Sequence, residues 1–509
     1  MNPKSQNFMR PGANGNTRRM SSMRIRTIGA VLAVAALAAC QASELNITNP
    51  NQATVAGASA DPSALQLLAT GLLADYRGQT NTLYQPAGNL GRESYTFSPQ
   101  DGRSSTTYLI GYSVGGVQKI DPAAGFASGT AWTGPYGTLR DIYNFKSTVA
   151  NSTLSAAQKS AALGFAQTLE AHCYLILVAA HDTLGLITEI KDNAADLAPF
   201  VSRDSVYKFI LGTLDAGATN LAGGGTAFPF NLHSGFTGFN TPATFAQLNR
   251  ALKAKAASYY ATSGGGATAW QAAIAALGAS YMNASATTRA QFDAGPTQIY
   301  STSTGDAANP FSVTNNTTLY AHMSLQTDVQ LKADGTPDNR YLAKIRTGLP
   351  SRQGPVTADG PTSASSTLGF SMWPTQTTPV SILRNEELIL VRAEARLATG
   401  DKAGAIADLN QVRVNSGGLA ASTLTAASSN DNILTGILYE KRYSTMLEGN
   451  RWVDMRRYNR LNQLPLDIAS GPNKNFVATV FPIQQAECLV RAKATGNLLG
   501  PNGQNNCAP

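Results

Sequence analysis

Apolar residues recur every three or four positions along much of this 509-residue chain. That spacing places them on one face of a helix, so it predicts a mainly α protein. Between residues 62 and 76, for example, Leu65, Leu68 and Leu72 follow this pattern. Ser205 is placed to cap another of the predicted helices. Helices are expected at residues 62–76, 156–180, 205–221, 244–261, 267–281, 383–398, 402–414 and 431–447.

Two pairs of these helices, at residues 244–281 and 383–414, share one organisation. In each pair a helix runs into a tight glycine turn, "SGGG" or "TGD", and small residues then recur every third or fourth position. Small residues at that spacing let two antiparallel helices pack closely. We therefore expect tetratricopeptide-like repeats, although the interval between the two units is irregular.

Two long polar segments, residues 77–131 and 282–380, separate the helical parts and are rich in Gly, Pro, Thr and Asn. Loops of that size in a compact domain are usually functional or disordered. Both segments contain several tyrosines and other aromatic residues, which argues against plain disorder. The predicted architecture is therefore a superhelix of helical repeats with long irregular loops.

The N-terminal segment has the organisation of a bacterial lipoprotein signal. The basic residues 20–26 precede the apolar run 28–39, which is too short to span a bilayer as an anchor. The run ends in "LAAC", which looks like a lipobox, so we expect cleavage before Cys40 and lipidation of that cysteine. An ordinary secretory signal with an incidental cysteine is the alternative. Gln41, where an aspartate would retain the protein in the inner membrane, favours the outer membrane.

Removal of residues 1–39 as a signal peptide would leave residues 40–60 as a lipidated tether and residues 61–509 as the body. The removed segment holds six Lys and Arg residues and no acidic residue, so the formal net charge falls from +8 to +2. No basic stripe remains in the rest of the chain. A nucleic-acid partner is therefore not expected.

Three other cysteines follow Cys40. Cys173 lies in the apolar run "CYLILVAA", which predicts a buried, inert thiol. Cys488 and Cys507 lie in the C-terminal part, and in an oxidising compartment they are plausible disulfide partners. Their spacing matches no zinc pattern.

Motifs of catalysis are missing from the sequence. The four histidines show no ligand spacing such as HExxH, and neither a G-x-S-x-G elbow nor a phosphate-binding P-loop occurs. We therefore expect no metal, no cofactor and no catalytic residue. A glycan hydrolase remains an alternative, because it needs only two carboxylates and the chain has 31 acidic residues.

The segment "EGNRWVDMRRYN", residues 448–459, gathers five charged side chains around Trp452 in a chain of which only 14% is charged. Gly449 is expected to end the preceding helix. Arginine and carboxylate side chains held against a tryptophan form bidentate bonds and stack, so we interpret the segment as a brace between two helical segments. A contact to a ligand or to a partner protein is the alternative.

Several motifs are similar to those of the SusD/RagB-like outer-membrane nutrient-binding lipoproteins. The most specific block is "ILRNEELILVRAEARLATGDKAGAIADLNQVR" followed by "ILYEKRYSTMLEGNRWVDMRRYN". "AWTGPYGTLRDIYNFKSTV" resembles the Trp-then-helix motif of the family, which assigns Trp132 to the core. "TLEAHCYLILVAAHDTLGLITEI" resembles its central helix, and "FPIQQAEC" its closing segment.

The resemblance implies a tetratricopeptide-like scaffold on the cell surface, anchored in the outer membrane through its lipid. Such proteins cap a TonB-dependent, SusC-like transporter and deliver oligosaccharides or other nutrients to it without catalysis. A helical-repeat scaffold of that complex, with no small-molecule site of its own, is an alternative from a different class.

The resemblance also implies where the ligand binds. In relatives that bind glycans, contacts come from a loop after the first helix and from another before the last repeat pair. The alternative for each aromatic residue among them is that it anchors its loop to the helices. The expected ligand-binding residues are Asn89, Arg92, Tyr95, Phe97, Tyr320, Tyr341 and Trp373.

Overall fold

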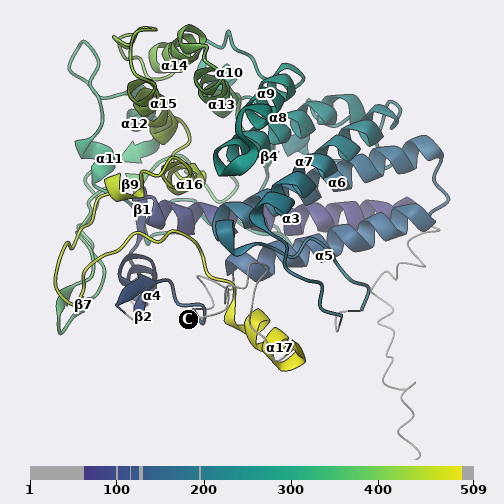
Figure 1. Ribbon diagram of the computed structural model, residues 1–509, viewed down its shortest axis with the longest axis horizontal. Coiled ribbons are helices and arrows are strands. Elements are labelled where there is room, and N and C mark those ends of the chain that lie inside the picture. Colours follow the sequence, from purple (N-terminus) through teal and green to yellow (C-terminus); the bar gives the residue numbers. More distant parts are fainter. Residues whose placement is uncertain (1–61, 99–100, 115, 125–129, 194–195, 496–509) are drawn as a thin grey trace, which may run out of the picture. The chain divides into compact units, whose positions relative to one another are not determined.

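Helices dominate the computed structural model, which describes residues 62–98, 101–114, 116–124, 130–193 and 196–495. The long helices pack on one another in chain order from α5 to α9, and α13 then packs on both α8 and α9. Figure 1 shows α3, α5 and α6 running side by side, while α13, α14 and α15 gather at the upper edge of the view. The long helices are α3 (Pro62–Leu90), α5 (Thr130–Asn151), α6 (Ala156–His181), α7 (Arg203–Ala222), α8 (Pro242–Tyr260), α9 (Gly266–Gly278), α13 (Asn385–Ala398), α14 (Lys402–Asn415) and α15 (Asn430–Ser444).

Helix α6 is the central element of this arrangement. Ser155 and Gln158 form a capping box at its start, which satisfies free backbone N–H groups of the first turn. From Ala161 to His181 nearly every residue is buried, because α5, α7, α3 and α8 all pack against the helix. Residues 156–184 are long and apolar enough to cross a membrane, but this burial identifies a core helix.

Most predicted helices are confirmed to within a few residues, and the helix pairs α8–α9 and α13–α14 are present as predicted. The end of α3 is wrong: the helix continues past residue 76 and through Pro86 to Leu90. A proline inside a helix costs about 3 kcal/mol, and the burial of Leu83, Ala87 and Leu90 beyond residue 76 offsets that cost. The cap of α7 is also wrong, since Ser202 accepts the hydrogen bond from the Ser205 N–H.

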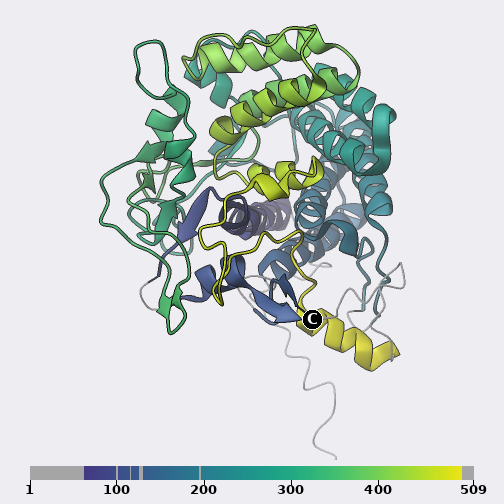
Figure 2. The same ribbon diagram turned by 60° about the vertical axis from the view of Figure 1, so that its left-hand side comes forward.

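The long segment between α9 and α13 folds into short elements. Three of its strands join β1 (Ser94–Thr96) in a four-stranded sheet of order β1-β5-β9-β6, with Tyr95 opposite Tyr320. Figure 2 shows most of this segment on the left of the view. The remaining elements are α4 (Arg103–Ser105), β2 (Tyr112–Val114), β3 (Val117–Lys119), α10 (Arg289–Asp293), β4 (Thr297–Gln298), β5 (Leu319–Ala321), α11 (Ser324–Thr327), α12 (Asn339–Lys344), β6 (Ile345–Arg346), β7 (Val356–Thr357), β8 (Gly360–Pro361), β9 (Gly369–Phe370), β10 (Val380–Ser381), α16 (Asn450–Arg457) and α17 (Gln485–Thr495).

Candidate ligand-binding site

The seven predicted ligand residues lie in two places, and none of them is more than 5% exposed. Tyr95, Phe97 and Tyr320 pack together at strands β1 and β5, a group we call the β1–β5 aromatic cluster. The rings of Tyr95 and Phe97 stack with centroids 4.7 Å apart. Asn89 and Arg92 lie just before β1 in the chain.

Polar atoms of these residues are occupied by other parts of the chain. The hydroxyl of Tyr95 donates to Asp467 Oδ2 at 2.8 Å, and that of Tyr320 donates to the Pro350 carbonyl at 3.2 Å. Arg92 donates to the carbonyls of Pro465 and Phe476 at 3.0 and 2.6 Å. These contacts favour the alternative weighed from the sequence, in which the residues anchor their loops. Ligand contact by any of them stays a prediction.

Tyr341 and Trp373 belong to a different buried cluster, together with Phe311 and Tyr443. The ring of Phe311 lies 5.1 Å from that of Trp373, so most of the indole surface is covered. Trp373 nevertheless forms part of the wall of an open pocket. It is the one predicted ligand residue among the described lining of that pocket.

This pocket, called the α12–α13 pocket below, has a volume of about 530 Å³. That size falls within the range of about 300–1,000 Å³ found for small-molecule sites. Its walls come from the segment before α13 and from the repeat pair α13–α14. The lining residues are Arg289, Asp293, Asn339, Arg340, Ala343, Lys344, Met372, Trp373, Pro379, Val380, Ser381, Arg384, Asn415, Ser416 and Glu448.

The rim and the floor of the α12–α13 pocket differ in chemistry. Exposed side chains at the rim include the amides Asn339 and Asn415 and the guanidinium of Arg289. The floor is buried and combines Trp373 with charged groups, among them Arg384. Amides at the rim can exchange hydrogen bonds with sugar hydroxyls, and the apolar parts of the wall can cover sugar C–H groups.

Buried ion pairs fix the floor. Arg384 Nη2 contacts Glu448 at 2.6 Å, and Arg384 Nη1 contacts Asp293 at 2.8 Å. Glu386, behind the floor, accepts from Arg289 at 2.6 Å and from Arg384 at 3.1 Å. Burial alone would raise the pKa of Glu386, but the positive charges of Arg289 and Arg384 outweigh it and hold that pKa below its usual range. Glu386 is therefore ionised at neutral pH.

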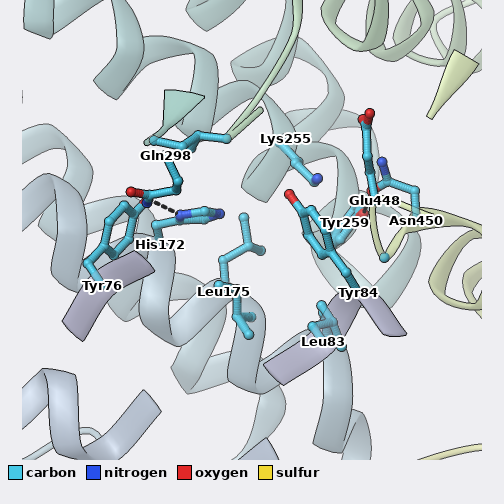
Figure 3. Close-up of a pocket in the computed structure, with 14 residues that line it drawn as sticks. Tyr76, Leu83, Tyr84, His172, Leu175, Lys255, Tyr259, Gln298, Glu448 and Asn450 are labelled. Atoms are coloured by element: carbon cyan, nitrogen blue, oxygen red, sulfur yellow. Dashed lines mark hydrogen bonds between the residues drawn. The ribbon is translucent and has the colours of Figure 1, made fainter. Parts of the chain in front are cut away.

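Glu448 also borders a second, much smaller cavity (Figure 3). Tyr76 and His172 hydrogen-bond at one end of this cavity, while Tyr84 and Lys255 lie at the other. Its volume is about 30 Å³, far below the range of ligand pockets of about 300–1,000 Å³. Burial lowers the pKa of His172 to about 3, so this histidine is neutral. The cavity cannot admit a sugar ring.

A second open pocket of about 500 Å³ lies between α5, the segment after α6, and α17, with Trp132 and Tyr136 in its wall. Trp132 is 3% exposed and its ring lies 5.0 Å from that of His181, which confirms its assignment to the core. Rim charges of both signs, including Lys191 and Glu189, pair with each other. None of the seven predicted ligand residues lines this pocket.

The interpretation of residues 448–459 as a brace is confirmed by their contacts. The chain breaks between α15 and α16 as expected, but α15 already ends at Ser444, and Gly449 adopts a left-handed conformation directly before α16. Asp454 on α16 bonds Lys441 on α15 at 2.8 Å and Arg457 at 2.8 Å. Trp452 is fully buried and donates to the Ala478 carbonyl at 2.7 Å, with Arg456 stacked 4.6 Å from its ring.

The sequence reasoning missed the polar residues of the α12–α13 pocket. Arg384 belongs to the block "ILRNEE", which was noted only as a family motif, and Arg289 stands four residues before Asp293, a spacing that favours a helical ion pair. Nothing in the sequence links Arg289 to Glu386, which lies 97 residues further along the chain.

Two of the predicted covalent sites, Cys40 and Cys507, lie outside the described residues. Cys488 is buried on α17, and its pairing with Cys507 stays a prediction. Cys173 is a buried free thiol, as predicted. Within the described residues, no group of His, Cys, Asp and Glu side chains could hold a metal ion.

The fold and the pocket define a helical-repeat protein with an open site between a long loop segment and its repeat pair. The model of the SusD family matches residues 252–498, a range that contains every lining residue of the α12–α13 pocket. This chain belongs to the SusD/RagB family. A search of curated proteins found no match.

Solved structures share this fold. B. fragilis NanU is 15% identical with a TM-score of 0.60, over 90% of this chain and 100% of that one. A SusD-like carbohydrate binding protein from Bacteroides fragilis is 14% identical with a TM-score of 0.60, over 87% and 99% of the two chains. A structure with a xylogluco-oligosaccharide is 16% identical with a TM-score of 0.56, over 79% and 85%.

Proposed function

We propose that this protein binds an oligosaccharide in the α12–α13 pocket and delivers it to a TonB-dependent transporter. The observation that carries the proposal is a pocket of about 530 Å³ in the family-matched part of the chain. Its rim carries Asn339 and Asn415, which suit sugar hydroxyls, and Met372 and Trp373 supply apolar wall. The likeness to a SusD-like carbohydrate binding protein and to a structure with a xylogluco-oligosaccharide supports a glycan as the ligand.

Binding without catalysis fits the state of the two carboxylates that line the pocket. A glycosidase needs one carboxylic acid and one carboxylate free to act on the glycosidic bond. Asp293 and Glu448 are both ion-paired with Arg384. Prolonged incubation with a bound glycan should therefore release no shorter product, and chromatography of the mixture tests this. Release of product would favour a hydrolase.

Delivery to a transporter rests on the lipobox at Cys40 and on membership of the family. A lipid on Cys40 would hold the protein on the outer membrane, where it faces the cell surface beside a SusC-like partner. Pull-down from outer membranes should recover that transporter. A scaffold without its own ligand would recover the transporter and yet show no saturable binding of any glycan.

The direct test measures glycan binding by the form lacking residues 1–40, first on a glycan array and then by calorimetry. Ala343 is exposed and lines the pocket, so Ala343→Trp should fill the space and remove binding. The matched control is Ala333→Trp, at an exposed alanine that does not line the pocket. Equal binding by both variants would exclude this pocket, and flat responses to glycans and peptides alike would reject the function.

A further inference from the structure

Positively charged side chains outnumber negative ones in the wall of the α12–α13 pocket. Arg289, Arg340, Lys344 and Arg384 line it, against only two acids, Asp293 and Glu448. A pocket meant for a neutral glycan needs no such excess. The question is which of the four cations are already neutralised by the protein.

The three arginines have carboxylate partners. Arg340 is fully buried and bonds Asp338 and Glu440, each at 2.6 Å. Arg289 and Arg384 share Asp293 and Glu386, and Arg384 also holds Glu448. These arginines and acids form a network around the floor in which each charge meets its opposite.

Lys344 differs from the arginines. Its ammonium donates to the backbone carbonyls of Tyr443, at 2.8 Å, and of Ser444. Within the described part of the chain it forms no ion pair, although only 8% of the residue is exposed. A buried ammonium that meets only neutral carbonyls is poorly compensated for its lost hydration.

The charges that face Lys344 come from four directions. Arg340 precedes it on α12, Arg384 and Glu386 lie at the start of α13, Arg289 lies on α10, and Glu448 follows α15. Burial, together with the positive charges of Arg384 and Arg289, lowers the pKa of Lys344 to about 7, although Glu448 and Glu386 act in the opposite direction. A negatively charged group of a ligand that enters the pocket would favour the protonated form of Lys344.

We propose that the α12–α13 pocket selects glycans that carry an acidic group, a carboxylate or a sulfate, which pairs with Lys344. This inference rests on the proposed function and names its ligand class. The rim amides bind hydroxyls of the same glycan, while the ammonium of Lys344 pairs with its acidic group. A neutral glycan would leave this ammonium without a negative partner. Binding of the acid draws a proton onto Lys344 at slightly alkaline pH.

The first experiment compares three probes by calorimetry on the full-length protein in detergent: an oligogalacturonide, a sulfated galactan oligosaccharide and a neutral xylogluco-oligosaccharide. A charge-assisted pair with a desolvated ammonium favours at least one acidic probe by about tenfold or more. The carboxylated and sulfated probes distinguish the two sources of charge. The preference should shrink as salt screens the pair.

The second experiment measures proton uptake, by titration at pH 7.5 in two buffers with different ionisation enthalpies. The acidic probe should take up a fraction of a proton, because the lysine is partly neutral in the free protein, and the neutral probe should take up none. This result needs no substitution, so it holds even if variants fold poorly. In wild-type protein the affinity for the acidic probe should rise from pH 8 to pH 6.

The third experiment uses Lys344→Met, which removes the charge at similar volume and should abolish both the acid preference and the proton uptake. Lys208→Met is the matched control, since Lys208 is 65% exposed on α7 and lines no part of the pocket. Equal affinity of wild-type protein for acidic and neutral probes would overturn the inference and leave the proposed function standing. Failure of every probe to bind would count against the function itself.

Discussion

The β1–β5 aromatic cluster and the α12–α13 pocket both draw on the long segments that separate the helices, but the first is closed and the second is open. In the cluster, Tyr95 and Phe97 stack on each other and meet Tyr320 across the strand pair. In the pocket, Trp373 packs against Phe311 and lines the space together with charged and amide groups. An aromatic residue in a loop therefore does not by itself indicate a sugar-binding site. Whether its ring can contact a sugar depends on which other side chains cover it.

Substitutions in the buried parts of the molecule should lower the stability of the fold. Trp452→Ala should have the largest effect, a loss of about 3–5 kcal/mol in the free energy of unfolding, because it empties a fully buried site. Chemical denaturation measures this loss. Trp452→Phe is the control and should lose less, since only the bond to the Ala478 carbonyl and part of the ring are removed. Loss of glycan affinity with unchanged stability would contradict the interpretation as a brace.

Glu386 lies behind the floor of the pocket, where its carboxylate pairs with Arg289 at the rim and with Arg384 in the floor. Removing one partner of a buried ion pair leaves the other charge uncompensated, so Glu386→Gln should destabilise the protein by roughly 3–5 kcal/mol at pH 7. Denaturation curves for the variant and for Glu189→Gln, at an exposed acid on the surface, test this. The surface variant should change stability little.

The same carboxylate makes stability depend on pH. The pKa of Glu386 is lowered in the folded state, so its contribution is present above the ordinary value of 4.5 and is lost as the pH falls below it. Melting temperatures between pH 7 and pH 3 should therefore fall more steeply for the wild-type protein than for Glu386→Gln. Parallel slopes would show that other acids dominate.

Tyr95→Phe provides a smaller test within the aromatic cluster. The substitution keeps the stacked ring but removes the donor to the Asp467 carboxylate, which should cost about 1.5–3 kcal/mol. Glycan affinity should not change, because the residue is 2% exposed. If affinity falls while the melting temperature stays constant, the cluster contacts the ligand and the comparison with the pocket fails.

Local sequence patterns could predict the helices but not which loop residues close on one another. The turn at Gly400 and the apolar spacing around it identify the α13–α14 pair from neighbouring residues alone. The hydroxyl of Tyr95, in contrast, meets Asp467 across 372 positions of the chain. Such a partner leaves no local pattern, so the sequence could suggest an aromatic loop surface without showing that the surface is buried.

The polar residues of the α12–α13 pocket could not be predicted from local sequence patterns either. Asn339, Asn415 and Lys344 have no common motif, and they come together only because α12 packs near the ends of α14 and α15. Trp373 was found because it is a conspicuous residue in a long loop. The amides beside it were not, since isolated asparagines are ordinary loop residues.

The smallest expected effect on stability is that of a substitution at the rim of the α12–α13 pocket. This substitution is also the sharpest test of ligand binding there. Asn415 is exposed at the end of α14, so Asn415→Ala should change stability by no more than about 0.5 kcal/mol. Loss of one hydrogen bond to a sugar hydroxyl should weaken glycan binding by about fivefold. Asn432→Ala, at an exposed asparagine on α15 outside the pocket, is the matched control for calorimetry. If both variants bind like the wild-type protein, Asn415 makes no ligand contact, and the glycan would have to be held by Asn339, Lys344 and the apolar wall.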